Sequence, residues 1–110
     1  MDYRALEDGM AEKRQFIVTI GFRAKPGKAR ELERELRNWV PISRTEAGNL
    51  DYRLYRSNTD SHRFFLFSRY QSEKSFDLHL YQPYSLSTMA EFEELLADPP
   101  RVETYETILG

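Results

Sequence analysis

The hydrophobic pattern along this chain of 110 residues predicts an α+β domain with the element order βαββαβ. Apolar residues recur at every second position in several segments, which is typical of strands. Between these segments the apolar spacing lengthens to three or four residues, which is typical of helices. Proline and glycine mark most of the boundaries. We expect residues 15–110 to form this domain, and residues 1–14, which show no sustained period, to form a flexible arm.

The first strand and the first helix are expected at residues 15–23 and 28–40. Every second residue of the strand is apolar, as shown by Phe16, Val18, Ile20 and Phe22. The helix carries Ala29, Leu32, Leu36 and Trp39 on one face. Pro41 is expected to end this helix, because a proline disfavours helical backbone in the residue before it.

The second half of the chain repeats the alternation of elements. A strand over residues 50–57 places Leu50, Tyr52 and Leu54 on one face and Tyr55 on the other. After a hairpin, a strand over residues 63–70 is apolar on both faces. Ser72 is a suitable N-cap for a helix through Leu80. After Pro83 the helical spacing resumes to about Ala97, and a last strand is expected over residues 102–109.

This order of elements is that of the ferredoxin-like fold, an antiparallel sheet with both helices on one face. Two helices cover only one face, yet the strand over residues 63–70 has Phe65 and Phe67 on one side and Phe64 and Leu66 on the other. An antiparallel sheet with a solvated face normally shows polar residues there. We therefore expect a second copy of the chain to cover the open face, which makes the protein a homodimer.

Composition excludes several classes of function. There is no cysteine, which rules out disulfide scaffolds, thiolate metal sites and a thiol nucleophile. The net charge of −2 argues against nucleic acid or an anionic membrane as a partner. No apolar run approaches the roughly 20 residues of a membrane span. Residues 1–14 are too charged for a secretory signal, so we expect a cytoplasmic protein.

Four segments, taken together in order and spacing, resemble the antibiotic-biosynthesis monooxygenase family, which includes small quinol monooxygenases. They combine a turn after the first strand, an E-x-G turn with a following tyrosine, an S-E segment with a histidine, and a late tyrosine. The segments are Ala24–Lys28, Glu46–Tyr55, Tyr70–Leu80 and Tyr105–Glu106. The resemblance covers about residues 15–109.

The resemblance implies a dimeric α+β barrel with a pocket between sheet and helices in each subunit. It also implies that the substrate, a small phenol, hydroquinone or polyketide-type aromatic, is oxidised by O2 without metal or flavin. Such chemistry is feasible because an electron-rich phenolate transfers an electron to O2 by itself. The protein then needs only to exclude water, accept a proton and stabilise the anion.

His79 is the candidate catalytic residue. The resembled family places a histidine at this position in its pocket, and the imidazole suits proton transfer near neutral pH. The residues expected to line the substrate pocket are Trp39, Tyr52, Tyr70, Phe76 and Tyr84. Core packing is the competing interpretation for each of these rings. Glu46 borders a turn, where capping is the default role.

Two departures from the family pattern keep other functions open. Many members carry Glu and Trp where this chain has Ser68 and Tyr70. A dimer of this fold that binds a small ligand or supports assembly without catalysis is therefore the alternative. A haem-degrading branch uses the histidine at the His79 position as its iron ligand, together with an asparagine on the first strand and a tryptophan on the third. This chain has neither at those positions.

Overall fold

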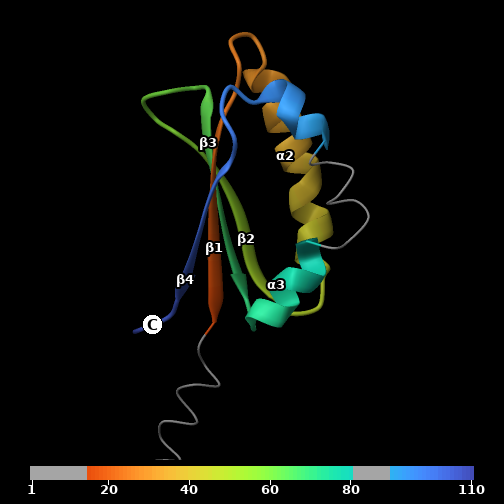
Figure 1. Cartoon of the computed structure of the whole chain (residues 1–110), viewed down its shortest axis with the longest axis vertical. Helices are drawn as coiled ribbons and strands as arrows, with labels where there is room; N and C mark the ends of the chain where they lie inside the picture. The colour runs from red at the N-terminus through yellow and green to blue at the C-terminus, as the bar shows by residue number, and fades with distance from the viewer. Residues whose placement is uncertain (1–14, 81–89) are drawn as a thin grey trace, which may run out of the picture.

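The computed structural model describes residues 15–80 and 90–110, which form one sheet with helices on one side (Figure 1). The elements are β1 (Phe16–Arg23), α2 (Ala29–Arg44), β2 (Asn49–Arg56), β3 (Arg63–Tyr70), α3 (Glu73–Leu80) and β4 (Arg101–Glu106). A further helical segment covers residues 90–95. The expected arm at residues 1–14 and the break at Pro83 lie outside the described residues.

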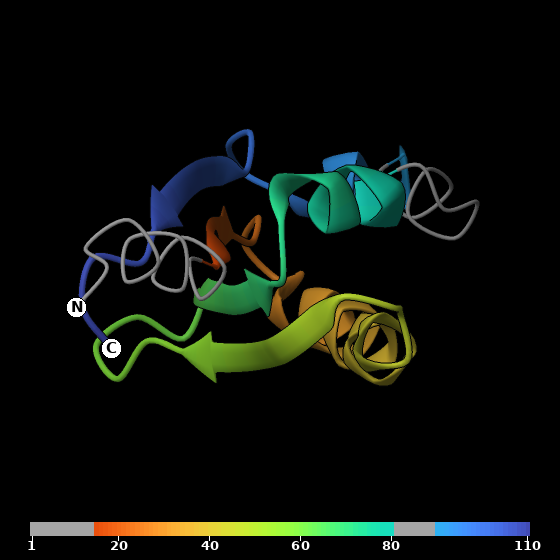
Figure 2. The same ribbon diagram turned by 90° about the horizontal axis from the view of Figure 1, so that it is seen from below.

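The four strands lie in the order β2-β3-β1-β4, and every neighbouring pair is antiparallel. Seen from below, α2 and α3 lie together on one face of the sheet, and no described element covers the other face (Figure 2). The prediction of an α+β, ferredoxin-like sheet with its helices on one face is thus confirmed. We call the helix-covered side the inner face and the opposite side the outer face.

The hydrophobic core fills the space between the inner face and the helices. Leu32 and Leu36 of α2 and Leu66 of β3 are fully buried there. Phe92, from the helical segment over residues 90–95, packs its ring centroid 5.9 Å from that of Phe22 and 5.4 Å from that of Trp39. The late helical segment therefore closes the core at the end where β1 leads into α2.

Pro41 does not end α2, contrary to the prediction. The helix continues to Arg44, although a proline at this position cannot donate a backbone hydrogen bond to the preceding turn. Val40 and Ser43 are buried on the sheet side of this last turn, so tertiary packing holds it in place. The helix ends at Thr45, whose backbone N–H and hydroxyl both donate to the carbonyl of Ile42.

Two other predictions on strand residues are wrong. Leu50 does not join Tyr52 and Leu54 in the core, because the β2–β3 register shifts between Asn49 and Asp51 and leaves Leu50 41% exposed. The last strand ends at Glu106 rather than at residue 109. Glu106 pairs with Phe16, the first residue of β1, so the neighbouring strand offers no further partner.

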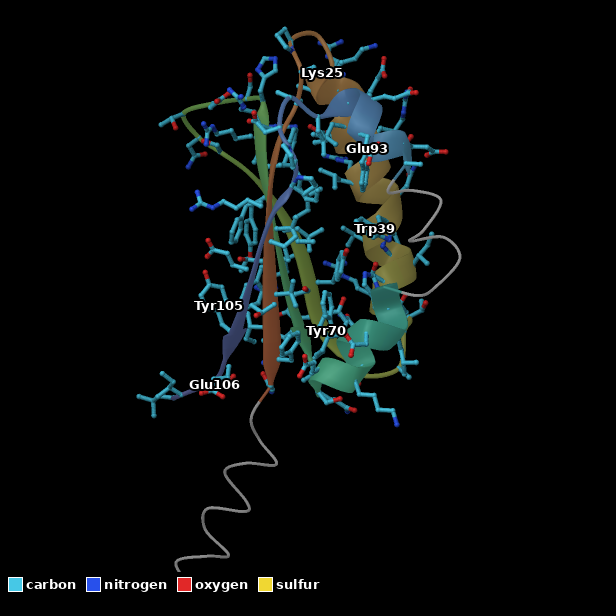
Figure 3. The ribbon with its side chains drawn as sticks, in the orientation of Figure 1. Lys25, Trp39, Tyr70, Glu93, Tyr105 and Glu106 are labelled. Atoms are coloured by element: carbon cyan, nitrogen blue, oxygen red, sulfur yellow. The ribbon has the colours of Figure 1, made fainter. Side chains whose placement is uncertain are left out.

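The outer face carries exposed aromatic side chains, as the sequence predicted. Tyr55 on β2, Phe65 on β3 and Tyr105 on β4 are between 44% and 49% exposed there. Tyr52 lies on the inner face and is 1% exposed, so the predicted opposition of Tyr52 and Tyr55 is also confirmed. Tyr105 lies away from the helices, whereas Trp39 and Tyr70 lie between the helices and the sheet (Figure 3).

Candidate active site

A buried histidine–carboxylate pair lies where α3 meets the end of α2. His79 is 4% exposed, and its Nδ1 lies 2.6 Å from Oε2 of Glu46, in the turn after α2. With the carboxylate as acceptor, Nδ1–H is the donor, which makes Nε2 the nitrogen that carries the basic lone pair. The pair therefore has the geometry of a histidine held in one tautomer by an acid.

Four aromatic rings enclose the imidazole of His79. Trp39 stacks on it at a centroid distance of 5.7 Å, and Phe76 does so at 6.3 Å. The rings of Tyr52 and Tyr70 are tilted against it at 5.9 and 5.8 Å. We call these four rings around His79 the aromatic box. It places the His79–Glu46 pair in surroundings of low polarity, where electrostatic interactions are strong.

A glycine turn and a serine cap bring Glu46 and His79 together. Gly48 has a φ of +85°, and a Cβ on it would lie 2.6 Å from Cβ of Ser75 at the start of α3. The Gly48 carbonyl accepts a hydrogen bond from the backbone N–H of Gln71 at 2.8 Å. Ser72 caps α3 by accepting the backbone N–H of Ser75 on its hydroxyl, as predicted. Only glycine permits this close packing of the turn on α3.

The aromatic box also contains polar atoms with unused hydrogen-bonding capacity. Within the described residues, four buried side-chain atoms have no hydrogen-bond partner: Trp39 Nε1, Ser43 Oγ, Glu46 Oε1 and Tyr70 Oη. Buried polar atoms without a partner are rare, because each costs free energy. Trp39, Ser43 and Glu46 follow one another at spacings of four and three residues, so they line one side of α2 and its end.

Burial keeps the two tyrosines of the aromatic box in their neutral form. Loss of hydration raises the pKa of Tyr52 well above its ordinary value. Burial likewise raises the pKa of Tyr70, and the nearby Tyr52 and Glu46 add to the effect. Both side chains therefore retain a hydroxyl that donates a hydrogen bond across the whole neutral range.

The structure brings together most of the residues that the sequence singled out. Trp39, Tyr52, Tyr70 and Phe76 all surround His79. Tyr84 lies outside the described residues.

Sequence reasoning missed Glu46 and Ser43. Glu46 binds His79 instead of capping its turn, and the two residues are 33 positions apart. Its place in the E-x-G segment of the family resemblance was the available signal. Glu46 also supplies an acid to the site, although the third strand has Ser68 where many family members have Glu.

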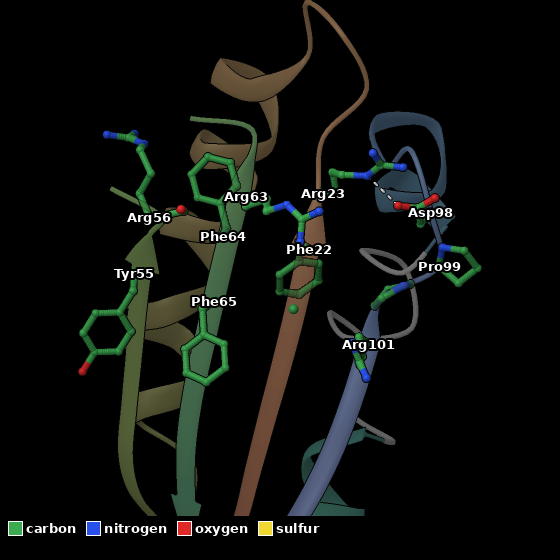
Figure 4. A pocket seen from close by; sticks show the side chains of 13 residues that line it. Phe22, Arg23, Tyr55, Arg56, Arg63, Phe64, Phe65, Asp98, Pro99 and Arg101 are labelled. Carbon is green, nitrogen blue, oxygen red and sulfur yellow. Dashed lines mark hydrogen bonds and ion pairs between the residues drawn. The ribbon is translucent and has the colours of Figure 1, made fainter. Parts of the chain in front are cut away.

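A hollow of about 640 Å³ lies at the end of the sheet where Arg23 and Arg63 pair (Figure 4). His79 packs on Tyr70, at the opposite end of β3. The rim of the hollow carries Arg23 and Arg63, each already bonded to an acid. Arg23 Nε donates to Asp98 at 2.6 Å, and Arg63 Nε donates to Asp60 at 3.2 Å. These ion pairs account for the charge at this end of the sheet.

Neither a metal cluster nor a membrane helix occurs in the part of the chain that the structure describes. Residues 15–80 and 90–110 contain no group of three or more His, Cys, Asp or Glu side chains arranged to hold a metal ion. Over the same residues, no helix has the length and apolar character needed to cross a bilayer.

The fold and the site together define a small α+β protein with a buried histidine–carboxylate pair between its sheet and its helices. The sequence profile of the antibiotic biosynthesis monooxygenase family matches residues 15–91. The chain belongs to this family, as its sequence segments indicated.

Similar proteins come from several bacteria. The crystal structure of PA3566 from Pseudomonas aeruginosa superposes with a TM-score of 0.83 at 28% identity and covers 89% of this chain and 98% of its own. The structure of Rv0793 from Mycobacterium tuberculosis superposes with a TM-score of 0.83 at 28% identity. The match covers 87% of this chain and 97% of Rv0793. The uncharacterised protein sll1783 of Synechocystis is 25% identical over 91% of this chain and 68% of its own.

Proposed function

We propose that this protein is a cytoplasmic monooxygenase that oxidises a phenolic aromatic with O2, using His79 as the proton acceptor. The observation that carries the proposal is the buried His79–Glu46 pair inside the aromatic box, at 2.6 Å between Nδ1 and Oε2. Membership of the monooxygenase family supports the reaction class. The rings of the box suit a flat aromatic ligand, because aromatic side chains stack on such ligands.

In the proposed reaction, the phenol transfers its proton to Nε2 of His79, and Glu46 stabilises the imidazolium that forms. The phenolate passes one electron to O2, and the two radicals combine to form a carbon–oxygen bond. The resulting hydroperoxide loses water and leaves a quinone. One phenol with a free ring position and one O2 therefore give one quinone and one water. The substrate loses four electrons, and O2 gains them.

The polar atoms of the box have a role in this scheme. Tyr70 Oη and Trp39 Nε1 are buried and have no hydrogen-bond partner among the described residues. Both can donate a hydrogen bond to an oxygen of the bound aromatic. Donors fixed in place before binding stabilise a developing negative charge without reorganisation. We assign them to holding the phenolate oxygen, or the oxygen that becomes the quinone carbonyl.

Oxygen uptake by the metal-free protein with a panel of hydroquinones and polycyclic phenols tests this proposal. We expect His79→Gln to lower kcat by about 10²–10⁴-fold, the usual contribution of a general base. Glu46→Gln should lower kcat with little change in KM, because Glu46 acts through His79. His62→Gln is the matched control: His62 is the other of the two histidines and lies in the β2–β3 hairpin loop. Unchanged turnover in His79→Gln would overturn the assigned role.

The alternative is a ligand-binding or assembly protein of the same fold, and one added measurement separates it from an enzyme. Trp39 is the single tryptophan of the chain and stacks on His79, so its fluorescence reports directly on the aromatic box. Quenching by a phenol without O2 uptake would favour the binding function. Haem degradation gains no support from β1, which contains no asparagine, or from β3, where Tyr70 replaces the tryptophan.

We also propose that the protein works as a homodimer that pairs through the outer face. The support is the exposure of Tyr55, Phe65 and Tyr105 there, on a face that no described element covers. Exposed aromatic clusters of this kind mark protein interfaces. Sedimentation equilibrium at micromolar concentration tests it, and a monomer at all concentrations would contradict it.

A further inference from the structure

Gly21 occupies the middle of β1, where a glycine is unfavourable. Glycine loses more conformational freedom on folding than alanine does, so it destabilises the interior of a strand. Glycines inside strands usually serve a bulge, a positive φ or the close approach of another group. Gly21 pairs with Phe65 on β3 and with Arg101 on β4 in unbroken register, and its φ is not positive. Backbone geometry therefore gives no reason for the glycine.

Packing within the chain does not require the glycine either. A Cβ built on Gly21 would meet Cβ of Arg101 at 3.7 Å and the Arg101 carbonyl oxygen at 4.0 Å, which are ordinary van der Waals distances. An alanine would therefore fit at this position of the strand. Nothing in residues 15–80 and 90–110 thus calls for a glycine there.

Gly21 lies at the bottom of a hollow in the outer face. Two open grooves, of about 490 and 640 Å³, share Gly21, Phe65 and Arg101 in their walls. Phe65 on β3 and Arg101 on β4 stand on either side of β1 (Figure 4). Phe65 is 44% exposed, and Tyr105 on β4 is 49% exposed. No side chain projects from Gly21 into this hollow, and we call the hollow above Gly21 the socket. The outer face also carries exposed aromatic rings, such as Phe65, that are of a size to occupy the socket of a second copy.

The charges of the outer face do not oppose its burial against an identical face. Asp51 binds both Arg53, at 2.8 Å, and Arg69, at 3.5 Å. Arg101 Nε lies 3.4 Å from a carboxylate oxygen of Glu103. The arginines at the β1–β3 end are paired with Asp98 and Asp60. The five arginines named here lie beside four carboxylates, so the group has a net charge of only +1 and meets little like-charge repulsion from a second copy.

The area of the outer face also suits a second copy. Four strands, of which three have eight residues, give a flat footprint of about 500 Å² at the usual spacings of about 4.8 Å between strands and 3.4 Å along them. The accessible area of projecting side chains exceeds this footprint. Stable complexes at the small end bury about 600 Å² on each partner.

We propose that the hollow above Gly21 is the socket of the homodimer interface and that Phe65 of the second copy fills it. The inference rests on the proposed dimer and specifies its register. Gly21 and Phe65 are register partners on adjacent strands. A two-fold axis that runs along the strands between β1 and β3 places each Phe65 over the Gly21 of the other copy. Such reciprocal contact is what an isologous interface requires.

Sedimentation equilibrium over a dilution series tests the socket. We expect Gly21→Val to raise the dimer Kd at least tenfold by filling the hollow, and Gly21→Ala to raise it by a smaller factor. Phe65→Ala should raise it by an amount similar to Gly21→Val. Thr19→Val is the matched control: it changes the next outer-face residue of β1 without changing its shape, and its Kd should stay within threefold of the wild type.

Far-UV circular dichroism establishes that each variant is folded, and Phe65→Ala decides the matter if Gly21→Val does not fold. A dimeric wild type whose Kd is unchanged in Gly21→Val or in Phe65→Ala overturns the socket and leaves the dimer standing. A wild type that is monomeric at every concentration overturns both. Oxygen uptake that depends on His79 is measured separately, so failure of the monooxygenase proposal is distinguishable from either result.

Discussion

The inner and outer faces of the sheet both carry large apolar side chains but differ in what surrounds them. Leu66 and Phe65 are neighbours on β3, yet Leu66 is fully buried under the helices and Phe65 is 44% exposed. The inner face also encloses polar groups, His79 and Ser43, which are 4% and 0% exposed. The covered face therefore encloses its polar groups in a dry environment, while the open face leaves its rings partly in solvent.

The largest expected effect comes from the core of the inner face. Leu66→Ala should lower the free energy of unfolding by about 2–5 kcal/mol, because it leaves a cavity under α2. Phe65→Ala, one position away on the outer face, should cost the monomer less than about 1 kcal/mol, because the ring is already half in water. Urea unfolding at low protein concentration measures both. Equal losses would contradict the difference between the two faces.

The turn that brings Glu46 and His79 together in the candidate active site gives the next effect. Gly48→Ala and Gly27→Ala both place a side chain on a positive φ, +85° and +78° respectively, at a cost of about 1–3 kcal/mol each. A Cβ at Gly27 meets nothing within 4 Å, whereas one at Gly48 overlaps Ser75. We expect Gly48→Ala to be the more destabilising in thermal unfolding, and to be the one of the two that shifts the fluorescence of Trp39. A shift in Gly27→Ala alone would show that the turn at Gly48 does not position the box.

Alkaline pH should lower the free energy of unfolding, because the buried tyrosines of the inner face stay protonated in the folded protein. Burial raises the pKa of Tyr70 above the ordinary value of 10.0, so the folded protein keeps a proton that the unfolded chain releases. The stabilisation is fully present below pH 10 and is lost as pH rises beyond it. The free energy of unfolding should fall less steeply above pH 10 in Tyr70→Phe than in the wild type. An unchanged slope in Tyr70→Phe would contradict this contribution of Tyr70.

The smallest effect is expected from the exposed side of α2. Arg37 Nε lies 3.1 Å from Oε2 of Glu33, one helical turn earlier. Such a pair adds about 0.2–0.5 kcal/mol to a helix. Arg37→Ala should lower the free energy of unfolding by that amount at low salt, and by nothing measurable at about 1 M salt, where exposed charges are screened. A loss that persists at high salt would mean that the Arg37 side chain contributes packing instead.

The elements with strong hydrophobic periodicity were predictable from the sequence. The residues at which these helices and strands end were harder to predict. The alternation in β1 and β3 and the serine cap of α3 depend on neighbouring residues, so local rules were sufficient. The end of α2 depends on burial of Val40 and Ser43, which overrides Pro41. The bulge at Leu50 and the end of β4 depend on pairing with other strands.

In the candidate site, too, some residues were predictable from the sequence and others depended on the tertiary structure. His79 and the four rings around it were predicted from the family resemblance. Glu46 was assigned to capping, because its partner lies 33 residues away and nothing in the intervening sequence fixes that distance. Ser43 gave no signal at all, since a serine in the last turn of a helix is ordinarily exposed.

The sequence by itself determined the order of the elements, the apolar character of both sheet faces and the family. These follow from periodicity, composition and short segments, which act between residues close in the chain. Only the tertiary structure decided that Glu46 meets His79. It also decided that polar atoms of the box have no partner among the described residues, and that none of those residues requires a glycine at position 21. Such features depend on which surfaces meet and how much space is left between them, and no local pattern encodes either.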